Sequence, residues 1–173
     1  MSIVTVVGNP RPGSRTHGVA LRAAEAVARR IGDEEAPEVV DLAALAPLLF
    51  APETAPEVRA AVELVAGADV LVVASPTYKA TYTGLLKVFL DRLPGGALAS
   101  AVALPLLVMG DARHSLAVEV HFRPLLVELG ATVPTPGLAL LESQIPGLDA
   151  VLGPWADRAG PQVIAALGKR APG

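Results

Sequence analysis

The sequence predicts an α/β fold in which a parallel sheet carries helices on both faces. Three observations support this prediction. Short runs of apolar, largely β-branched residues at 3–7, 70–74 and 101–108 indicate strands buried on both faces. Segments with apolar residues at helical spacing alternate with these runs. Glycine and proline, 16 of each among 173 residues, cluster between the segments, where they are typical of turns.

The first half of the chain supplies three predicted strands. Turn residues at 8–16 follow the strand at 3–7, and a helix is expected over 17–31. A brief second strand is expected at Val39 and Val40. The segment 42–54, which contains two prolines, is long for a connection, so we expect a lid or a partner surface there. A helix over 56–66, with Pro56 in its first turn, leads into the third strand.

The second half continues the alternation. Proline has no N–H for a strand ladder, so Ser75-Pro76-Thr77 should end the third strand. Apolar spacing predicts a helix from residue 83 to residue 93, and a fourth strand at 101–108. A helix is expected over 115–129, where Pro124 should bend or bulge it. A fifth strand is expected to start at 130–133, and a last helix at about 156–167, after turns at 146–147 and 153–154.

Right-handed crossovers leave few arrangements for five parallel strands. We expect a three-layer sandwich with the flavodoxin-like strand order 2-1-3-4-5, forming a single domain over residues 1–173. The switch point of this order lies between the first and third strands. The loops after residues 7, 75 and 109 should therefore converge on one ligand site.

Composition excludes several classes of function. The net charge is −3 and the 14 basic residues are dispersed, so we expect neither a nucleic-acid partner nor binding to an anionic membrane surface. The chain has no cysteine, hence no disulfide, thiol nucleophile or thiolate metal site. The longest apolar stretch, 97–109, is too short to span a bilayer, and no basic segment precedes the first strand. We expect a soluble cytoplasmic protein.

The first loop, 8–16, lies between a strand and the start of a helix, where unsatisfied N–H groups and the helix dipole favour phosphate. Ser14 and Thr16 could add hydroxyl donors, and Arg11 and Arg15 charged ones. The alternative is a turn with a helix cap and solvated arginines. The loop has no dinucleotide glycine pattern and no Walker lysine.

The second loop, 76–82, holds both tyrosines of the chain. A tyrosine on such a loop can cover a flat heterocycle, and neighbouring backbone N–H groups can bind its polar edge. Tyr78 suits this role or a subunit contact, whereas Tyr82 suits packing beneath the following helix. Lys79 could balance an anionic ligand or remain solvated.

The third loop contains Gly110, Asp111, Arg113 and His114. His114 could act as a general acid or base, although a capping role fits its position better. No nucleophile elbow and no zinc-binding H-E-x-x-H motif occurs in the chain. The acid–base candidates are therefore few.

With these residues the chain resembles the NADPH-dependent FMN reductase family, and within it the FMN reductases of two-component sulfonate monooxygenase systems. Three stretches carry the resemblance: Gly8-Asn9-Pro10-Arg11-Pro12-Gly13-Ser14-Arg15-Thr16; Ser75-Pro76-Thr77-Tyr78-Lys79 with Gly84-Leu85-Leu86-Lys87 and Asp91; and Gly110 through His114 to Arg123-Pro124-Leu125. The resemblance implies hydride transfer from NADPH to FMN, in which the flavin carries the chemistry and no catalytic side chain is required.

The resemblance also implies where FMN binds. Its phosphate would lie on the first loop and its ring against the second, with the third along the far edge; the implied residues are Arg11, Ser14, Arg15, Thr16, Pro76, Thr77, Tyr78, Lys79, Gly110 and Asp111. Arg11, Arg15 and Arg113 are candidates for the 2′-phosphate of NADPH. Asp111 stands where the family often has a second glycine, and its carboxylate could crowd or repel the flavin.

The resemblance further implies a homodimer or homotetramer that releases reduced FMN to a partner monooxygenase. Related tetramers can carry a π-bulge with an inserted tyrosine in the helix after the third loop, a region that Val120 and His121 occupy here. Three alternatives remain. The chain could retain FMN and reduce quinones, azo dyes or metal ions; it could be a flavodoxin-like electron carrier, although carriers usually have a more acidic surface; or it could be an interaction protein without flavin.

Overall fold

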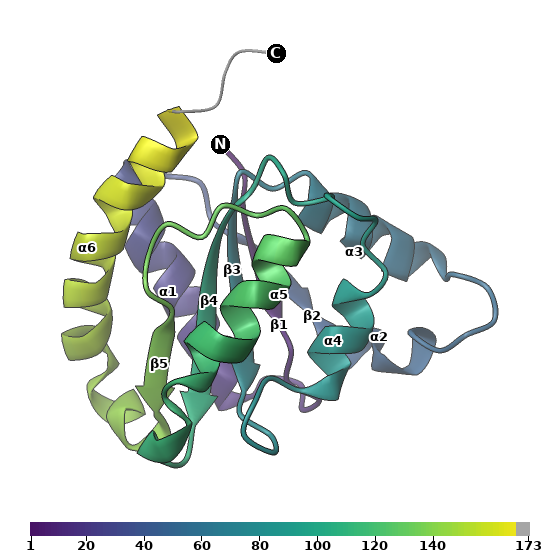
Figure 1. Ribbon diagram of the computed structural model, residues 1–173, viewed down its shortest axis with the longest axis horizontal. Helices are drawn as coiled ribbons and strands as arrows, with labels where there is room; N and C mark the ends of the chain where they lie inside the picture. Colours follow the sequence, from purple (N-terminus) through teal and green to yellow (C-terminus); the bar gives the residue numbers. More distant parts are fainter. Residues whose placement is uncertain (169–173) are drawn as a thin grey trace.

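Five parallel strands form the central sheet of the computed structural model, which describes residues 1–168 (Figure 1). The strands are β1 (Ile3–Val7), β2 (Glu38–Asp41), β3 (Val70–Pro76), β4 (Val102–Met109) and β5 (Leu138–Leu141). They lie in the order β2-β1-β3-β4-β5, which confirms the predicted topology. Val7 is level with Asp41 of β2 and Ala74 of β3, so the carboxyl ends of the central strands meet at one edge of the sheet.

Helices cover both faces of the sheet (Figure 1). They are α1 (Arg15–Ile31), α2 (Leu42–Leu45), α3 (Pro56–Ala66), α4 (Gly84–Leu90), α5 (Arg123–Glu128) and α6 (Leu148–Gly168). Val27 of α1 and Trp155 of α6 belong to the apolar core on one face. Phe89 of α4 and Leu126 of α5 belong to the core on the other. The strands between these cores are buried on both faces, which explains their continuous apolar runs.

The predicted start of the fifth strand is wrong. Thr132 forms only an isolated bridge with Val102, and β5 begins at Leu138, where it pairs with Leu106 of β4. The intervening segment contains two prolines, which cannot donate to a strand ladder. Arg123 of α5 donates instead to the carbonyl oxygens of residues 133 and 135 in this segment.

The predicted start of the last helix is also wrong. Helix α6 begins at Leu148 and continues through Pro154, where the sequence predicts a turn. A proline inside a helix costs about 3 kcal/mol. Leu152 and Trp155 flank Pro154, and both are buried against α1 and the sheet. Burial of two such side chains can contribute about 3–6 kcal/mol, enough to offset that cost.

The region from residue 112 to residue 128 is interrupted, as Pro124 predicts. It comprises a 3₁₀ turn, η2 (Ala112–His114), a π-helical segment, η3 (Val118–Phe122), and then α5. Pro124 is the second residue of α5, so its missing N–H falls at the helix start, where it has little cost. Val120 and His121 lie within η3, so the π-helical geometry is present without a tyrosine at either position.

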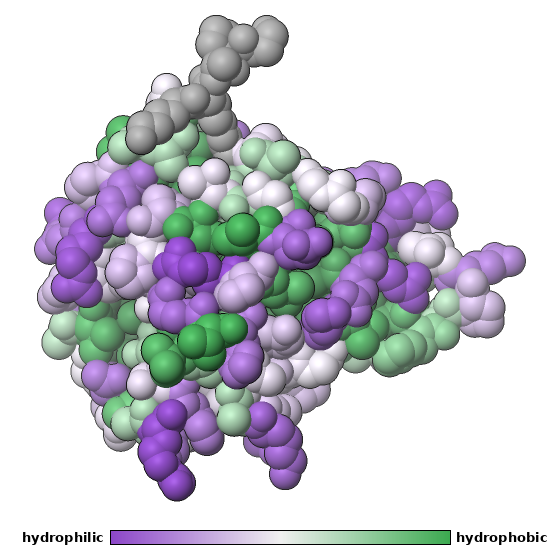
Figure 2. Space-filling model, viewed as in Figure 1, coloured by the Kyte–Doolittle hydropathy of each residue, from purple (hydrophilic) through white to green (hydrophobic). Residues whose placement is uncertain are grey.

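The segment expected to form a lid or partner surface contains α2 and a 3₁₀ turn, η1 (Ala46–Leu48), followed by the highly exposed Phe50. On the face that carries α5, apolar and polar side chains are interspersed (Figure 2). Leu116, Val120 and Val127 are exposed apolar side chains of this region. Within residues 1–168, no helix combines the length and apolar character needed to cross a membrane.

Candidate functional site

Buried hydrogen bonds tie the first and second loops together at the carboxyl edge of the sheet. The hydroxyl of Thr83 donates to the carbonyl oxygen of Gly8 at 2.6 Å, across 75 residues of sequence. Oγ1 of Thr83 also accepts from the N–H of Leu86 at 3.1 Å, so Thr83 caps α4 as well. Ser75 Oγ, at the end of β3, accepts from the N–H of Thr83 at 2.9 Å. These bonds position the loop after β3 against the loop after β1.

Gly8 is required by this close approach. A β-carbon at this position would lie 2.7 Å from Cβ of Leu86 on α4. Neither atom belongs to the flexible end of a side chain, so α4 would have to move away from β1. The absence of a side chain at Gly8 therefore allows the two loops to meet.

The first loop leads into the N-terminus of α1. Ser14 caps the helix by accepting from the N–H of His17 at 3.2 Å. Thr16 is 2% exposed, and its Oγ1 accepts from Nδ2 of Asn9 at 3.1 Å. Asn9 Oδ1 in turn accepts from the N–H of Arg11 at 3.0 Å. The loop is thus held in shape from within, and Thr16 takes part in that internal support.

The two arginines of this loop have different surroundings. Arg15, the first residue of α1, forms an ion pair with Glu142, which directly follows β5; Arg15 Nη2 and Glu142 Oε2 are 3.0 Å apart. The guanidinium of Arg11 is exposed and makes no ion pair or hydrogen bond with another residue of the described range, 1–168. The N–H groups of Arg15 and Thr16 donate to no acceptor in that range. Two cations and free N–H groups at a helix N-terminus suit a phosphate.

The second loop is a tight turn with unusual backbone angles. Tyr78 and Thr81 exchange two backbone hydrogen bonds, of 2.8 and 3.3 Å, around Lys79 and Ala80. The φ angles of Lys79 and Ala80 are 51° and 69°. Two consecutive positive φ angles are typical of a type I′ turn, which normally has glycine or asparagine at these positions. The turn leaves the Tyr78 side chain 43% exposed at the edge of the sheet.

Two hydroxyl groups beside this turn are buried without a partner in the described part of the chain. They are Oγ1 of Thr77 and Oγ1 of Thr81. A buried hydroxyl without a hydrogen bond costs about 1–3 kcal/mol, so such atoms often mark a ligand site. Pro76, by contrast, is fully buried within β3 and supports the loop from below.

Tyr82 has a structural role, as predicted, but its aromatic partner lies on η3 and not on the helix that follows the second loop. Its ring lies 5.4 Å from that of Phe122 in η3, at an interplanar angle of 49°. Such a tilted pair is a favourable aromatic arrangement. The contact joins the second loop to the π-helical segment and leaves Tyr78 as the more exposed tyrosine.

In the third loop, the carboxylate of Asp111 forms an ion pair with Arg113. Asp111 accepts from the backbone N–H of Arg113 at 2.9 Å and pairs with two nitrogens of its guanidinium, at 2.9 and 2.7 Å. These hydrogen bonds lower the pKa of Asp111 to about 2. The carboxylate is therefore ionised and compensated by Arg113. Gly110 is exposed, and a β-carbon there would have open space around it.

Two residues at this edge were not among the sequence-predicted site residues. Glu142 is brought to Arg15 only because β5 ends at the same edge as β1. Asp41, at the end of β2, caps α2 and lies 3.2 Å from Nδ1 of His17 in the first turn of α1. The rule that parallel strands end at one edge could have identified both carboxylates as neighbours of the first loop.

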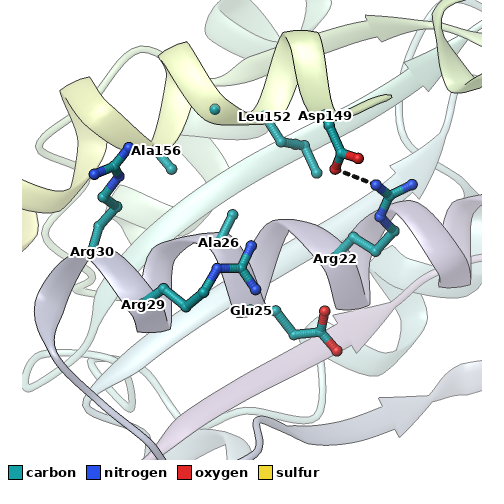
Figure 3. Close-up of a pocket in the computed structure, with 9 residues that line it drawn as sticks. Arg22, Glu25, Ala26, Arg29, Arg30, Asp149, Leu152 and Ala156 are labelled. Carbon is teal, nitrogen blue, oxygen red and sulfur yellow. Dashed lines mark hydrogen bonds and ion pairs between the residues drawn. The ribbon is translucent and has the colours of Figure 1, made fainter. Parts of the chain in front are cut away.

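A separate groove of about 340 Å³ runs between α1 and α6 (Figure 3). Arg22, Arg29 and Arg30 project from α1 along it, and Arg22 forms an ion pair with Asp149 of α6. Arg30 pairs with Asp157 in the same way. Arg22 lies seven residues beyond the start of α1, or about 10 Å along the helix. Arg22 and Arg30 therefore join α1 to α6 away from the three loops.

The residues at the carboxyl edge fit a flat ligand that carries a phosphate. Cations and free N–H groups stand at the start of α1, and an exposed tyrosine and two unpaired buried hydroxyls belong to the second loop. The Ser75–Thr83–Gly8 hydrogen bonds place these two halves side by side.

Comparison with known proteins gives a consistent result. Residues 1–144 match a family model described as NADPH-dependent FMN reductase. An FMN reductase (NADPH) of Pseudomonas putida is 35% identical over 154 residues, which cover 84% of this chain and 73% of that protein. An FMN reductase (NADPH) of Escherichia coli is 36% identical over 147 residues, which cover 84% and 75%. An NADH-dependent FMN reductase, SfnF, of Pseudomonas putida is 30% identical over 126 residues, which cover 71% of this chain and 68% of that protein.

Comparison with solved structures gives the same family of proteins. The apo form of an NADH:FMN oxidoreductase, EMOB, superposes with a TM-score of 0.85 and 33% identity, covering 98% of this chain and 91% of the other. A flavodoxin WrbA-like protein from Agrobacterium tumefaciens has a TM-score of 0.64 and 17% identity, covering 98% and 100%. The second similarity shows a shared fold alone.

Proposed function

The chain belongs to the NADPH-dependent FMN reductase family, and we propose how its three loops bind the flavin and what becomes of the reduced product. It is an oxidoreductase whose small-molecule partners are FMN and NADPH. When bound, FMN accepts the hydride of NADPH, so this chain's residues have to bind and orient the two molecules.

The first loop holds the phosphate of FMN in this proposal. Arg11 contributes an uncompensated charge, Ser14 its hydroxyl proton, and Arg15 its guanidinium and N–H group. Thr16 contributes its N–H group, while its buried side chain keeps the loop in shape. The flavin ring lies against Tyr78.

The second and third loops complete the ring site. Thr77 and the backbone around Lys79 offer polar groups to the ring edge, and Pro76 supports them from within β3. Gly110 allows close approach from the opposite side, because its surroundings are open. Asp111 faces Arg113, so the pair presents no uncompensated negative charge to the flavin.

One observation carries the assignment of the site. The Thr83 hydroxyl joins the second loop to Gly8, so a phosphate-binding helix start and a tyrosine-bearing turn lie on either side of one buried hydrogen bond. FMN has a phosphate at one end, which suits the helix start, and a flat heterocycle at the other, which suits the tyrosine-bearing turn. A flat ligand without a phosphate would leave the helix start unused.

We further propose that the protein releases reduced FMN to a flavin-dependent monooxygenase, acts as a homodimer or homotetramer, and works in the cytoplasm. The resemblance of the three loop sequences to FMN reductases of two-component sulfonate monooxygenase systems supports release. The exposed Leu116, Val120 and Val127 around η3 and α5 offer apolar surface for contact with a second copy.

Flavin release can be tested with purified protein. The visible spectrum should show little bound flavin, and NADPH oxidation should rise with added free FMN. A tightly bound yellow flavin that turns over only with a quinone would instead indicate an FMN-retaining reductase. Absence of both flavin affinity and NADPH oxidation would refute the enzyme assignment.

The phosphate site can be tested by Arg11→Gln. Loss of a charge-assisted contact should weaken FMN binding about tenfold, or about 1.4 kcal/mol. Arg29→Gln is the matched control, because Arg29 is also an exposed arginine but lies in the last turn of α1, away from the first loop. Equal FMN affinity in the two variants would contradict the proposed phosphate site.

A further inference from the structure

The ion pair between Arg15 and Glu142 joins two distant parts of the carboxyl edge. Arg15 is the first residue of α1, and Glu142 directly follows β5. The strands β3 and β4 lie between β1 and β5 in the sheet. Arg15 Nη2 is 3.0 Å from Glu142 Oε2, and both side chains remain substantially exposed. The pair therefore lies at the rim of the site, where each side chain can leave its partner and contact solvent or a ligand instead.

A cation at the first position of a helix is unfavourable for the helix itself. The N-terminal end of the helix dipole is positive, and it favours acidic side chains. The first turn of α1 contains no acidic residue, and Arg15 adds a positive charge to it. Two groups can compensate that charge: the carboxylate of Glu142, which lies beside it, and a ligand phosphate bound at the helix start.

We propose that Glu142 is a specificity-determining residue that reduces the contribution of the FMN phosphate to binding by competing with it for Arg15. This inference rests on the proposed FMN function. With Glu142 present, the phosphate of FMN has to displace the carboxylate from Arg15 or share Arg15 with it. The affinity for FMN therefore exceeds the affinity for riboflavin, which lacks the phosphate, by less than it otherwise would. The flavin consequently dissociates faster, as a reductase that supplies free reduced FMN requires.

The expected size of the effect follows from the exposure of the pair. Ion pairs at the surface contribute up to about 1 kcal/mol, which corresponds to about a fivefold change in affinity. Glu142→Gln should therefore lower the Kd of FMN by about three- to fivefold and slow its dissociation by a similar factor. Riboflavin affinity should be unchanged, because riboflavin has no phosphate to bring to Arg15.

The experiment measures the Kd of FMN and of riboflavin, by quenching of flavin fluorescence, for the wild-type protein, Glu142→Gln and Glu142→Asp. Glu142→Asp should keep most of the wild-type behaviour because the carboxylate is retained. In an Arg15→Gln background, Glu142→Gln should have a smaller effect on FMN, which identifies Arg15 as the group through which Glu142 acts. At about 1 M salt, where the Debye length is about 3 Å, the effect should also shrink.

The outcomes separate this inference from the function on which it rests. If the wild-type protein binds FMN more tightly than riboflavin but Glu142→Gln leaves that ratio unchanged or lowers it, the role of Glu142 is refuted and the phosphate site stands. An equal gain for riboflavin would refute competition at the phosphate, since the carboxylate would then act on the ring. If the wild-type protein binds neither flavin, the proposed function and this inference both fail.

Discussion

Replacing Thr83 with valine removes one hydroxyl group from the junction between the first and second loops. Thr83 is 2% exposed, and its Oγ1 donates to the carbonyl oxygen of Gly8 and accepts from the N–H of Leu86. Valine has nearly the same shape, so it would leave both of these groups without a partner. The variant therefore isolates the hydrogen bonds from the packing.

The magnitude follows from two contributions. Loss of a helix N-cap costs about 1 kcal/mol, and an unsatisfied buried carbonyl costs about 1–3 kcal/mol. Thr83→Val should thus lower the free energy of unfolding by about 2–4 kcal/mol. In a chain of this size that corresponds to a fall in Tm of about 5–15 °C.

The assay is urea unfolding at pH 7, followed by circular dichroism, with FMN affinity measured on the folded protein. Thr83→Ser is the matched control, because it keeps the hydroxyl and loses only a methyl group. We expect Thr83→Ser to bind FMN much as the wild-type protein does, and Thr83→Val to bind it more weakly. A Thr83→Val protein as stable as Thr83→Ser would refute the view that these hydrogen bonds hold the two loops together.

Three further predictions concern the surroundings of the site. Gly8→Ala should destabilise the protein by about 1–3 kcal/mol, because the new Cβ would lie 2.7 Å from Cβ of Leu86. Gly18→Ala, in open space on α1, should instead stabilise the protein by up to about 1 kcal/mol. Chemical unfolding of both variants checks this, and equal changes in stability would contradict it. Ala80→Gly should raise stability by up to about 1 kcal/mol by relieving a φ of 69°, and Ala80→Val should lower it; a glycine variant with a reduced Tm would argue against strain in the turn. The hydrogen bonds of Glu119 with Arg123 lower the pKa of Glu119 from its ordinary 4.5, so its stabilisation is fully present above that value and is lost as the pH falls through the lower folded value. Glu119→Gln should therefore cost about 1 kcal/mol, after allowance for solvent screening, at pH 7 and less in acid; a difference in urea midpoint that does not change with pH would contradict this.

Much of the fold follows from local patterns in the sequence. The double burial of the strands requires apolar runs, and the alternation of strands and helices restricts the sheet to a few topologies. The parallel order then brings the loops after β1, β3 and β4 to one edge, so the sequence predicts that candidate residues far apart in the chain lie together. The interruption near Pro124 was predictable for a local reason, whereas the ring contact that gives Tyr82 its structural role is with Phe122, on a different element.

Local rules were wrong where long-range contacts dominate. Pro154 predicts a helix break, but the burial of Leu152 and Trp155 against α1 and the sheet outweighs the lost hydrogen bond. Thr132 and its neighbours have the composition of a strand, yet Arg123 holds the following carbonyl groups and delays β5 until Leu138. In both cases the deciding partner is distant or lies on another element.

The sequence by itself determined the sandwich and the strand order, and so the meeting of the three loops at the carboxyl edge where we propose that FMN binds, because these depend on periodicity and connectivity. Only the tertiary structure decided which side chains at that edge are free. It pairs Asp111 with Arg113, buries the side chain of Thr16 and brings Glu142 to Arg15. The physical reason is that the state of a charge or a hydroxyl depends on the nearest group in space, and the folded sheet selects that group from anywhere along the chain.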